Sequence, residues 1–233
     1  MAVLRSLLYA ILFYPLTLAC VLAGILATAF GPRPTFAVVL CWAGLNHWLV
    51  EHILGIRIRV EGIIPTGPHL IAVKHQSMLE TLEMFRLTDF PVVVIKKELA
   101  DLPLFGWLTR RYGIIAVERT AGAKALRAML AEGRRALASG RPLLIYPEGT
   151  RVPVGEAPPL RSGFAALYRA LDVPVVPIAV DSGRLWGRGL VHRSGTMTIK
   201  VGKSIPPDLR REEVEARVHA AINALELRPE ASA

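Results

Sequence analysis

The sequence predicts an α/β domain, built from a sheet flanked by helices, that follows a pair of apolar N-terminal helices. Between Arg5 and Arg33 the chain carries no charged side chain and consists mainly of Leu, Ala, Val, Ile and Phe. From residue 56 onward, short segments rich in Val and Ile alternate with helix-like segments, which is the pattern of a layered α/β domain. We therefore divide the chain into a membrane anchor, residues 1–55, and an α/β domain, residues 56–233.

The first apolar segment, Leu7–Phe30, is long enough to cross a hydrocarbon core, which needs about 20 apolar residues in a helix. The second, Thr35–Val50, follows a predicted turn at residues 31–34 and is shorter. Such a pair either spans the membrane as a hairpin or dips into one leaflet. The competing interpretation is a signal peptide cleaved at Ala27–Ala29, but the apolar run exceeds a usual signal core.

Basic residues flank the two apolar segments on the same side. Arg5 precedes the pair, while Arg57 and Arg59 follow it. Because basic residues favour the cytoplasmic side, a hairpin would leave both of its ends in the cytoplasm. We expect the protein in the inner, or cytoplasmic, membrane, with its α/β domain facing the cytoplasm.

The α/β domain is predicted to alternate strands with helices. The predicted strands are Arg57–Val60, Leu70–Val73, Val92–Ile95, Ile114–Val117, Leu143–Tyr146, Val175–Val180 and Met197–Val201. The predicted helices are Ser77–Leu87, Leu104–Tyr112, Ala121–Ser139, Phe164–Leu171 and Arg211–Leu225. Two Gly-bearing segments, residues 152–163 and 181–195, are predicted to be functional loops rather than linkers.

The formal net charge of +9 indicates an anionic partner. A nucleic-acid partner is not expected, because the sequence shows neither a basic stripe with interleaved aromatic residues nor a known nucleic-acid-binding module. Beside an apolar anchor, the basic excess favours anionic lipid headgroups, at about 1 kcal/mol per basic residue near the surface. Both cysteines, Cys20 and Cys41, lie in the anchor and the six histidines are dispersed, so we expect neither a disulfide framework nor a metal site.

The segment KHQSMLET, Lys74–Thr81, carries the first cluster of polar residues, where a predicted strand meets a predicted helix. Side chains five residues apart on an ideal helix point about 140° from each other. His75 and Glu80 can therefore meet only if His75 lies in the turn before the helix, at the carboxyl edge of the sheet. The structural alternative is a capping box, in which Glu80 bonds back to Ser77 at the helix start.

Two later strand ends carry further charged residues. In IIAVERT, Ile114–Thr120, an apolar strand ends in Glu118 and Arg119. These two residues either form a plain salt bridge, or the forked guanidinium of Arg119 binds a phosphate. LLIYPEGTR places Glu148 and Arg151 in one Pro- and Gly-bearing loop. There the carboxylate could accept a bond from a substrate hydroxyl, while Arg151 and backbone N–H groups could bind phosphate. Residues 174–180 form a buried strand bounded by prolines.

Four motifs follow one another along the chain: KHQS with an acid at Glu80, VERT, YPEGTR and VPVVPIAV. With these motifs in this order, the sequence resembles the lysophosphatidic acid acyltransferases over about Ile71–Val180. The family is also called the 1-acylglycerol-3-phosphate O-acyltransferases. The resemblance implies a mixed sheet flanked by helices, as in glycerolipid acyltransferases, with an N-terminal two-helix membrane motif. The chain departs from the family pattern twice, because Glu80 replaces the usual aspartate and Tyr146 replaces the usual Phe.

The resemblance implies transfer of a fatty acyl group from acyl-CoA or acyl carrier protein to the free hydroxyl of a lysophospholipid, by default 1-acylglycerol 3-phosphate, to give phosphatidic acid. His75 and Glu80 would be the catalytic residues, with His75 taking the hydroxyl proton and Glu80 orienting its ring. Backbone N–H groups near Gln76 and Ser77 are the expected oxyanion donors. The implied substrate-binding residues are Arg119, Glu148, Gly149, Thr150 and Arg151. No cofactor or metal is expected, and the partners are membrane lipids and the acyl donor.

Three alternatives stay open on sequence alone. The acceptor could be another lysolipid, such as lyso-ornithine lipid. The chain could be a catalytically silent lipid-binding scaffold of the same fold, because Glu80 replaces the usual catalytic aspartate. A membrane-tethered hydrolase would instead release fatty acid from the thioester without an acceptor.

Overall fold

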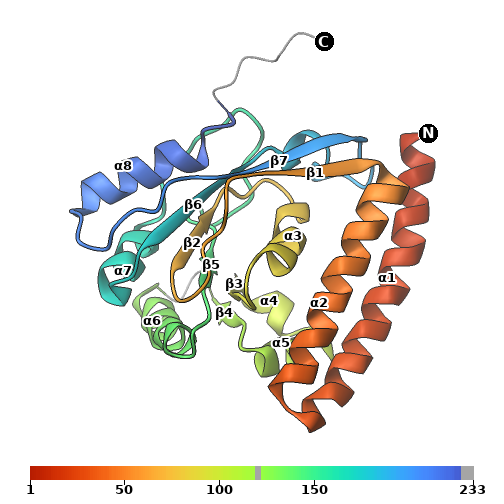
Figure 1. The fold of residues 1–233 in the computed structure, drawn as a ribbon, viewed down its shortest axis with the longest axis horizontal. Helices are drawn as coiled ribbons and strands as arrows, with labels where there is room; N and C mark the ends of the chain where they lie inside the picture. Colours follow the sequence, from red (N-terminus) through yellow and green to blue (C-terminus); the bar gives the residue numbers. More distant parts are fainter. Residues whose placement is uncertain (119–121, 227–233) are drawn as a thin grey trace.

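The computed structural model describes residues 1–118 and 122–226. Two long helices, α1 (Ala2–Ala27) and α2 (Pro32–Leu49), run side by side in opposite directions and are joined by the 3₁₀ turn η1 (Thr28–Phe30) (Figure 1). The turn predicted at residues 31–34 is wrong in extent, because α2 already begins at Pro32. A proline fits the first helical turn, where its missing N–H would have no partner.

Within the described residues the strands form a seven-stranded sheet in the order β1-β7-β6-β2-β5-β3-β4. All pairings between these strands are parallel except β6–β7, so the predicted mixed sheet is confirmed. The strands are β1 (Ile56–Glu61), β2 (Leu70–Val73), β3 (Val92–Lys96), β4 (Ile115–Val117), β5 (Leu143–Ile145), β6 (Val175–Val180) and β7 (Gly195–Val201).

Helices cover both faces of this sheet (Figure 1). One face packs against α6, α7 and α8, and the other packs against α3, α5 and the N-terminal hairpin. Strand β2 is buried on both sides, with Ile71 and Val73 in the hairpin-side core and Leu70 and Ala72 in the opposite core. The helices are α3 (Leu79–Leu87), α4 (Lys97–Ala100), α5 (Phe105–Tyr112), α6 (Gly122–Ala138), α7 (Ser162–Leu171) and α8 (Arg211–Ile222).

The hairpin packs along its length against the α/β domain. Near the start of α1, the Tyr9 ring meets the edge of Trp186, with ring centroids 5.3 Å apart. Near its end, Gly24 lies so close to Leu108 of α5 that an added Cβ would stand 2.8 Å from a Leu108 methyl carbon. The hairpin and the domain share one core, and the boundary at residue 55 stays a prediction.

The connection to the sheet is a π-helical turn, η2 (Val50–Leu54), which ends at Gly55. Gly55 has a left-handed backbone with φ +71°, which glycine adopts without steric cost, and β1 begins at the next residue. Among the described residues, α1–η1 and α2–η2 are long and apolar enough to cross a membrane. Little of either is buried inside the protein.

Candidate active site

His75 lies in the turn between β2 and α3. The backbone N–H of Lys74 still donates to Ile178 C=O at 2.9 Å, so the β2–β6 ladder continues up to the turn. After this residue the chain leaves the sheet and enters α3 at Leu79. The imidazole therefore stands at the carboxyl edge of the parallel strands, where α/β proteins bind ligands.

His75 and Glu80 meet as predicted. His75 Nδ1 lies 2.8 Å from Glu80 Oε1, and the Glu80 side chain is fully buried. The second oxygen, Oε2, accepts bonds from Ser77 Oγ and Ser182 Oγ, each at 2.6 Å. Ser182 comes from the 3₁₀ turn η3 (Ser182–Arg184) after β6, so two loops hold one carboxylate.

Glu80 also closes the predicted capping box. Its Oε1 accepts the backbone N–H groups of Ser77 at 2.8 Å and Gln76 at 2.9 Å, while Ser77 Oγ accepts the Leu79 N–H at 3.0 Å. The capping role and the orientation of His75 therefore coexist in one side chain. The expectation that the N–H groups of Gln76 and Ser77 stabilise an oxyanion is wrong, because both already donate to Glu80.

The surroundings of Glu80 keep it ionised. Burial alone would raise the pKa of this carboxyl, but hydrogen bonds from His75, Ser182 and Ser77 outweigh it and lower the pKa below its ordinary value of 4.5. An ionised carboxylate only accepts hydrogen bonds, so His75 Nδ1 carries the proton that lies between them. The other ring nitrogen, Nε2, is left as the acceptor that a general base needs.

Tyr146 fixes the face of the imidazole. The two rings stack with centroids 4.0 Å apart and planes 25° apart. Tyr146 Oη donates to Thr81 Oγ1 at 2.6 Å, and burial raises the pKa of the phenol well above its ordinary value. The sequence did not reveal this contact, because it joins strand ends 71 residues apart.

Glu148 lies behind His75 rather than at the surface of the site. Its Oε2 accepts the backbone N–H of His75 at 2.9 Å, and its Oε1 forms an ion pair with Lys74 Nζ at 2.8 Å. Both side chains of the pair are fully buried. The predicted bond from Glu148 to a substrate hydroxyl thus finds no exposed carboxylate oxygen to make it.

The buried Lys74 ammonium ties the C-terminal end of the chain to this turn. Besides Glu148, it donates to Asn223 Oδ1 at 2.6 Å and to the carbonyl of Glu156 at 2.7 Å. Three residues beyond Asn223, the carboxylate of Glu226 accepts bonds from the Gln76 side chain and from the Gly155 N–H. Sequence reasoning missed these anchors, since nothing in the C-terminal helix resembles a motif.

A cleft of about 540 Å³ opens in front of His75. Its lining residues are His75, Thr81, Val94, Ile95, Lys96, Leu99, Tyr146, Thr150, Arg151 and Arg188. Thr150 and Arg151 are exposed there, and Arg188 from the 181–195 loop donates to Arg151 C=O at 3.0 Å. Three cations beside one imidazole suit an anionic substrate.

Two of the predicted substrate-binding residues remain, Gly149 and Arg119. Gly149 shapes the loop: its φ of +70° suits glycine, its N–H donates to Tyr146 C=O at 2.9 Å, and an added Cβ would meet Arg161 at 3.0 Å. Arg119 lies outside the described residues. Among the described residues, no group of three or more His, Cys, Asp and Glu could hold a metal ion.

A family model described as Acyltransferase matches residues 56–181, which include His75 after β2 and Glu148 after β5. The chain belongs to this acyltransferase family. A 1-acyl-sn-glycerol-3-phosphate acyltransferase of Pseudomonas aeruginosa is 35% identical to it over 189 residues, which are 80% of this chain and 72% of that protein. The beta form of the enzyme of that name from Homo sapiens is 28% identical over 76% of this chain and 68% of its own length.

A solved structure shows the same fold as this acyltransferase. The 1-acyl-sn-glycerophosphate (LPA) acyltransferase PlsC from Thermotoga maritima superposes with a TM-score of 0.78, covering 99% of this chain and 100% of that one at 20% identity. The resemblance predicted from the four motifs is therefore confirmed, as is the sheet flanked by helices.

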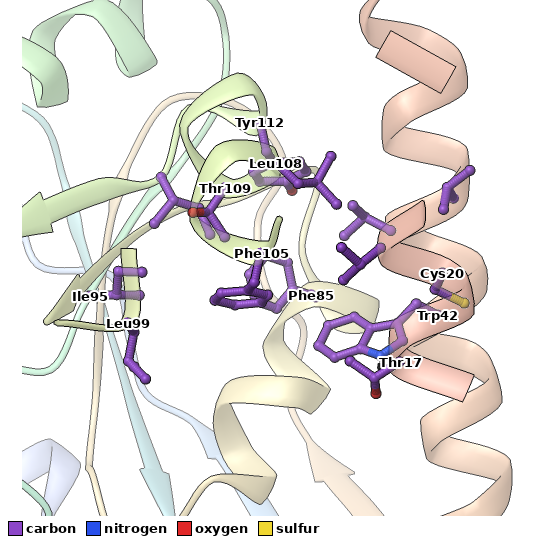
Figure 2. Close-up of a pocket in the computed structure, with 14 residues that line it drawn as sticks. Thr17, Cys20, Trp42, Phe85, Ile95, Leu99, Phe105, Leu108, Thr109 and Tyr112 are labelled. Atoms are coloured by element: carbon purple, nitrogen blue, oxygen red, sulfur yellow. Dashed lines mark hydrogen bonds between the residues drawn. The ribbon is translucent and has the colours of Figure 1, made fainter. Parts of the chain in front are cut away.

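The acyltransferase also contains an apolar cavity between the hairpin and the domain. It encloses about 110 Å³ and is lined by side chains of α1, α2, α3 and the α4–α5 region. Figure 2 shows Thr17, Cys20 and Trp42 of the hairpin on one side and Phe105 and Leu108 of α5 on the other. Ile95 and Leu99 line both this cavity and the cleft at His75, so the two spaces are neighbours.

Proposed function

We propose that this acyltransferase moves a fatty acyl group from a thioester donor to the free hydroxyl of 1-acylglycerol 3-phosphate, giving phosphatidic acid. The observation that carries the proposal is the His75–Glu80 pair, 2.8 Å apart, at a cleft that also exposes Arg151 and Arg188. The names of the Pseudomonas aeruginosa and human relatives support this acceptor.

In the proposed reaction His75 is the general base. Its Nε2 takes the proton of the acceptor hydroxyl as that oxygen attacks the thioester carbonyl, and the resulting imidazolium is stabilised by ionised Glu80. The tetrahedral intermediate then breaks its C–S bond, and the departing thiolate takes the proton from Nε2. The base is regenerated, and no acyl-enzyme forms.

The acceptor phosphate would be held by the cations of the cleft. Arg151, with its forked guanidinium, is proposed as the main contact, together with Thr150 and the predicted residue Arg119. Gly149 would contribute by shaping the loop. We assign Glu148 an indirect role, because its buried carboxylate reaches the substrate site only through the backbone of His75.

The apolar cavity is proposed to take an acyl chain. Its lining is almost entirely hydrocarbon, and it adjoins the cleft at Ile95 and Leu99. A chain seated there would bring its carbonyl or glycerol end towards His75. Burial of each methylene is worth about 0.8 kcal/mol, so a shaped apolar cavity also favours chains of matching length.

We propose that the hairpin lies in one leaflet of the cytoplasmic membrane, with the catalytic domain on the cytoplasmic side. Support comes from the contacts at both ends of α1, at Tyr9 and at Gly24, with parts of the α/β domain. A hairpin that crossed the bilayer would carry the charged residues near these contacts in the sequence, such as Arg184 and Arg111, into hydrocarbon, which is costly. A lysolipid acceptor could then reach the cleft without leaving its leaflet.

One assay panel tests the proposed reaction. The purified full chain is offered acyl-CoA or acyl carrier protein as donor, crossed with lysophosphatidic acid, glycerol 3-phosphate, lyso-ornithine lipid or no acceptor. We expect transfer to lysophosphatidic acid to be fastest. Faster transfer to another lysolipid would reassign the acceptor, fatty acid release without acceptor would indicate a hydrolase, and inactivity throughout would indicate a scaffold.

A further inference from the structure

The segment from α4 to α5, residues 97–112, exposes an apolar edge beside the N-terminal hairpin. Four large apolar side chains, Leu99, Leu102, Leu104 and Trp107, are each between 37% and 48% exposed. They lie within nine residues of one another, on a short helix, a connecting loop and the first turns of α5. Large apolar side chains that are exposed together on one short segment indicate an interaction surface.

The backbone holds this edge in a tight turn. Leu104 has φ +59° and ψ −59°, and the Phe105 N–H donates to Pro103 C=O at 2.6 Å, which forms a γ-turn. Two residues after Leu104, an added Cβ on Gly106 would stand 1.9 Å from the Ala100 carbonyl oxygen. A non-glycine residue persists in such a conformation only where its surroundings impose it, so the outward display of Leu104 is a built feature.

The edge continues the apolar surface of the hairpin. Leu108 of α5 packs on Gly24 of α1, which brings the two helices into contact. The outer side of α1 exposes Leu22 and Leu26 over the same stretch. Residues of both helices wall the apolar cavity, as Figure 2 shows for Cys20 and Leu108. The exposed end of α1 therefore lies beside α5.

Basic side chains border the apolar edge. Arg110 and Arg111 are exposed in the last turn of α5, and the Arg111 guanidinium lies 5.1 Å from the centre of the Trp107 ring. Residues 97–112 hold three basic and two acidic side chains. Leu and Trp side chains beside arginines are typical of a surface that sits at the boundary between headgroups and acyl chains.

We propose that the α4–α5 edge is a second membrane-contact surface, which inserts Leu102, Leu104 and Trp107 into the same leaflet as α1 and binds anionic headgroups through Arg111. The partner is thus an anionic bilayer. The apolar cavity, walled by α1 and α5, then opens towards lipid rather than water. This inference rests on the proposed membrane placement of the hairpin but makes a separate claim about residues 97–112.

Labelling at single positions tests the proposal. The full chain, with Cys20→Ala and Cys41→Ala, receives one cysteine at Leu104, at Leu22 or at Ile63, each carrying an environment-sensitive fluorophore, in phosphatidylcholine vesicles with phosphatidylglycerol. Ile63 is the matched control, because it is an exposed apolar residue after β1 that belongs neither to the hairpin nor to residues 97–112. We expect a lipid-dissolved quencher to quench labels at 22 and 104 but not at 63.

The outcomes separate the two claims. If the label at 22 is quenched but the label at 104, like the one at 63, is not, the α4–α5 proposal is overturned and the hairpin placement stays intact. A lack of quenching at both 22 and 104 overturns both. Quenching at 104 alone supports the edge and contradicts the placement of α1.

A charge variant tests the headgroup contact. Arg111→Glu should weaken binding to vesicles that contain phosphatidylglycerol by about five-fold for each unit of charge lost, and should not change binding to neutral vesicles. Arg169→Glu is the control, because Arg169 is exposed on α7, on the opposite face of the sheet. Equal effects of the two substitutions would show that only net charge matters and would remove Arg111 from the proposal.

Discussion

Glu148 accepts the backbone N–H of His75 at 2.9 Å while its other oxygen faces the buried Lys74 ammonium. Glu148, the acid of the YPEGTR motif, therefore holds the backbone of the general base from the buried side of the site. Its neighbours Thr150 and Arg151 face the cleft. One loop thus holds the catalytic turn and presents the anion-binding groups, and this relationship predicts how substitutions in the loop will differ.

Glu148→Gln should lower kcat with little change in the KM for lysophosphatidic acid. The amide can still accept the His75 N–H, but it leaves Lys74 buried without its counter-charge, which should reduce the free energy of unfolding by about 3–5 kcal/mol. Steady-state kinetics and urea unfolding in detergent micelles measure both effects. Glu213→Gln, which removes an exposed ion pair with Arg217 on α8, is the control. A rise in KM at constant kcat would instead indicate direct contact with the acceptor.

Tyr146→Phe should leave activity within a few-fold of wild type, whereas Tyr146→Ala should reduce kcat by about 10²-fold. The phenylalanine keeps the ring that stacks on His75 at 4.0 Å and loses only the bond to Thr81. The alanine frees the imidazole to turn. The comparison of kcat in the two variants separates stacking from hydrogen bonding, and equal losses would show that the hydroxyl carries the effect.

Ser182→Ala removes one of the bonds that keep Glu80 ionised. Loss of this 2.6 Å bond should raise the pKa of Glu80 towards its ordinary value and cost about 1–3 kcal/mol of unfolding free energy, since an ionised acceptor loses a buried partner. The loss of unfolding free energy in acid should therefore begin at higher pH than in the wild type, as urea unfolding at several pH values would show. The exposed Ser204→Ala serves as control. An unchanged acid dependence of unfolding would mean that Ser182 has no influence on the carboxylate.

Glu80→Gln should reduce stability in a pH-dependent way. The pKa of Glu80 is lower in the folded state than its ordinary value of 4.5, so the ionised carboxylate stabilises the fold above that value. This contribution is lost as the pH falls through the folded-state pKa. Urea unfolding of wild type and variant should therefore differ most above pH 4.5 and converge in stronger acid. A difference that grew in acid would contradict the sign of the shift.

The sequence was sufficient to predict most of the fold. Runs such as Leu70–Val73 and Val175–Val180 are strands with the predicted bounds, because short continuous apolar runs between turn residues are typical of strands buried on both faces. Helix α4 was not predicted, since four residues give too little periodicity to detect. The ends of α3 and α8 also differ, as helix ends depend on local caps.

The candidate site was only partly predictable. The contact between His75 and Glu80 followed from local geometry, because a turn before a capped helix allows it. The contacts of His75 with Glu148 and of Glu80 with Ser182 could not be predicted in this way, because the partners lie 73 and 102 residues apart in the sequence. Such contacts depend on the order of strands in the sheet, which brings the ends of β2, β5 and β6 together.

The central claim is that His75 is the general base of acyl transfer to a lysophospholipid. Its most direct test is the rate of acyl transfer to lysophosphatidic acid by wild type, His75→Ala and the control His52→Ala, which removes an exposed histidine of η2. We predict that His75→Ala lowers kcat/KM by about 10²–10⁴-fold while His52→Ala stays within a few-fold of wild type. A His75→Ala protein that is folded, bound to membranes and as active as wild type would contradict the claim.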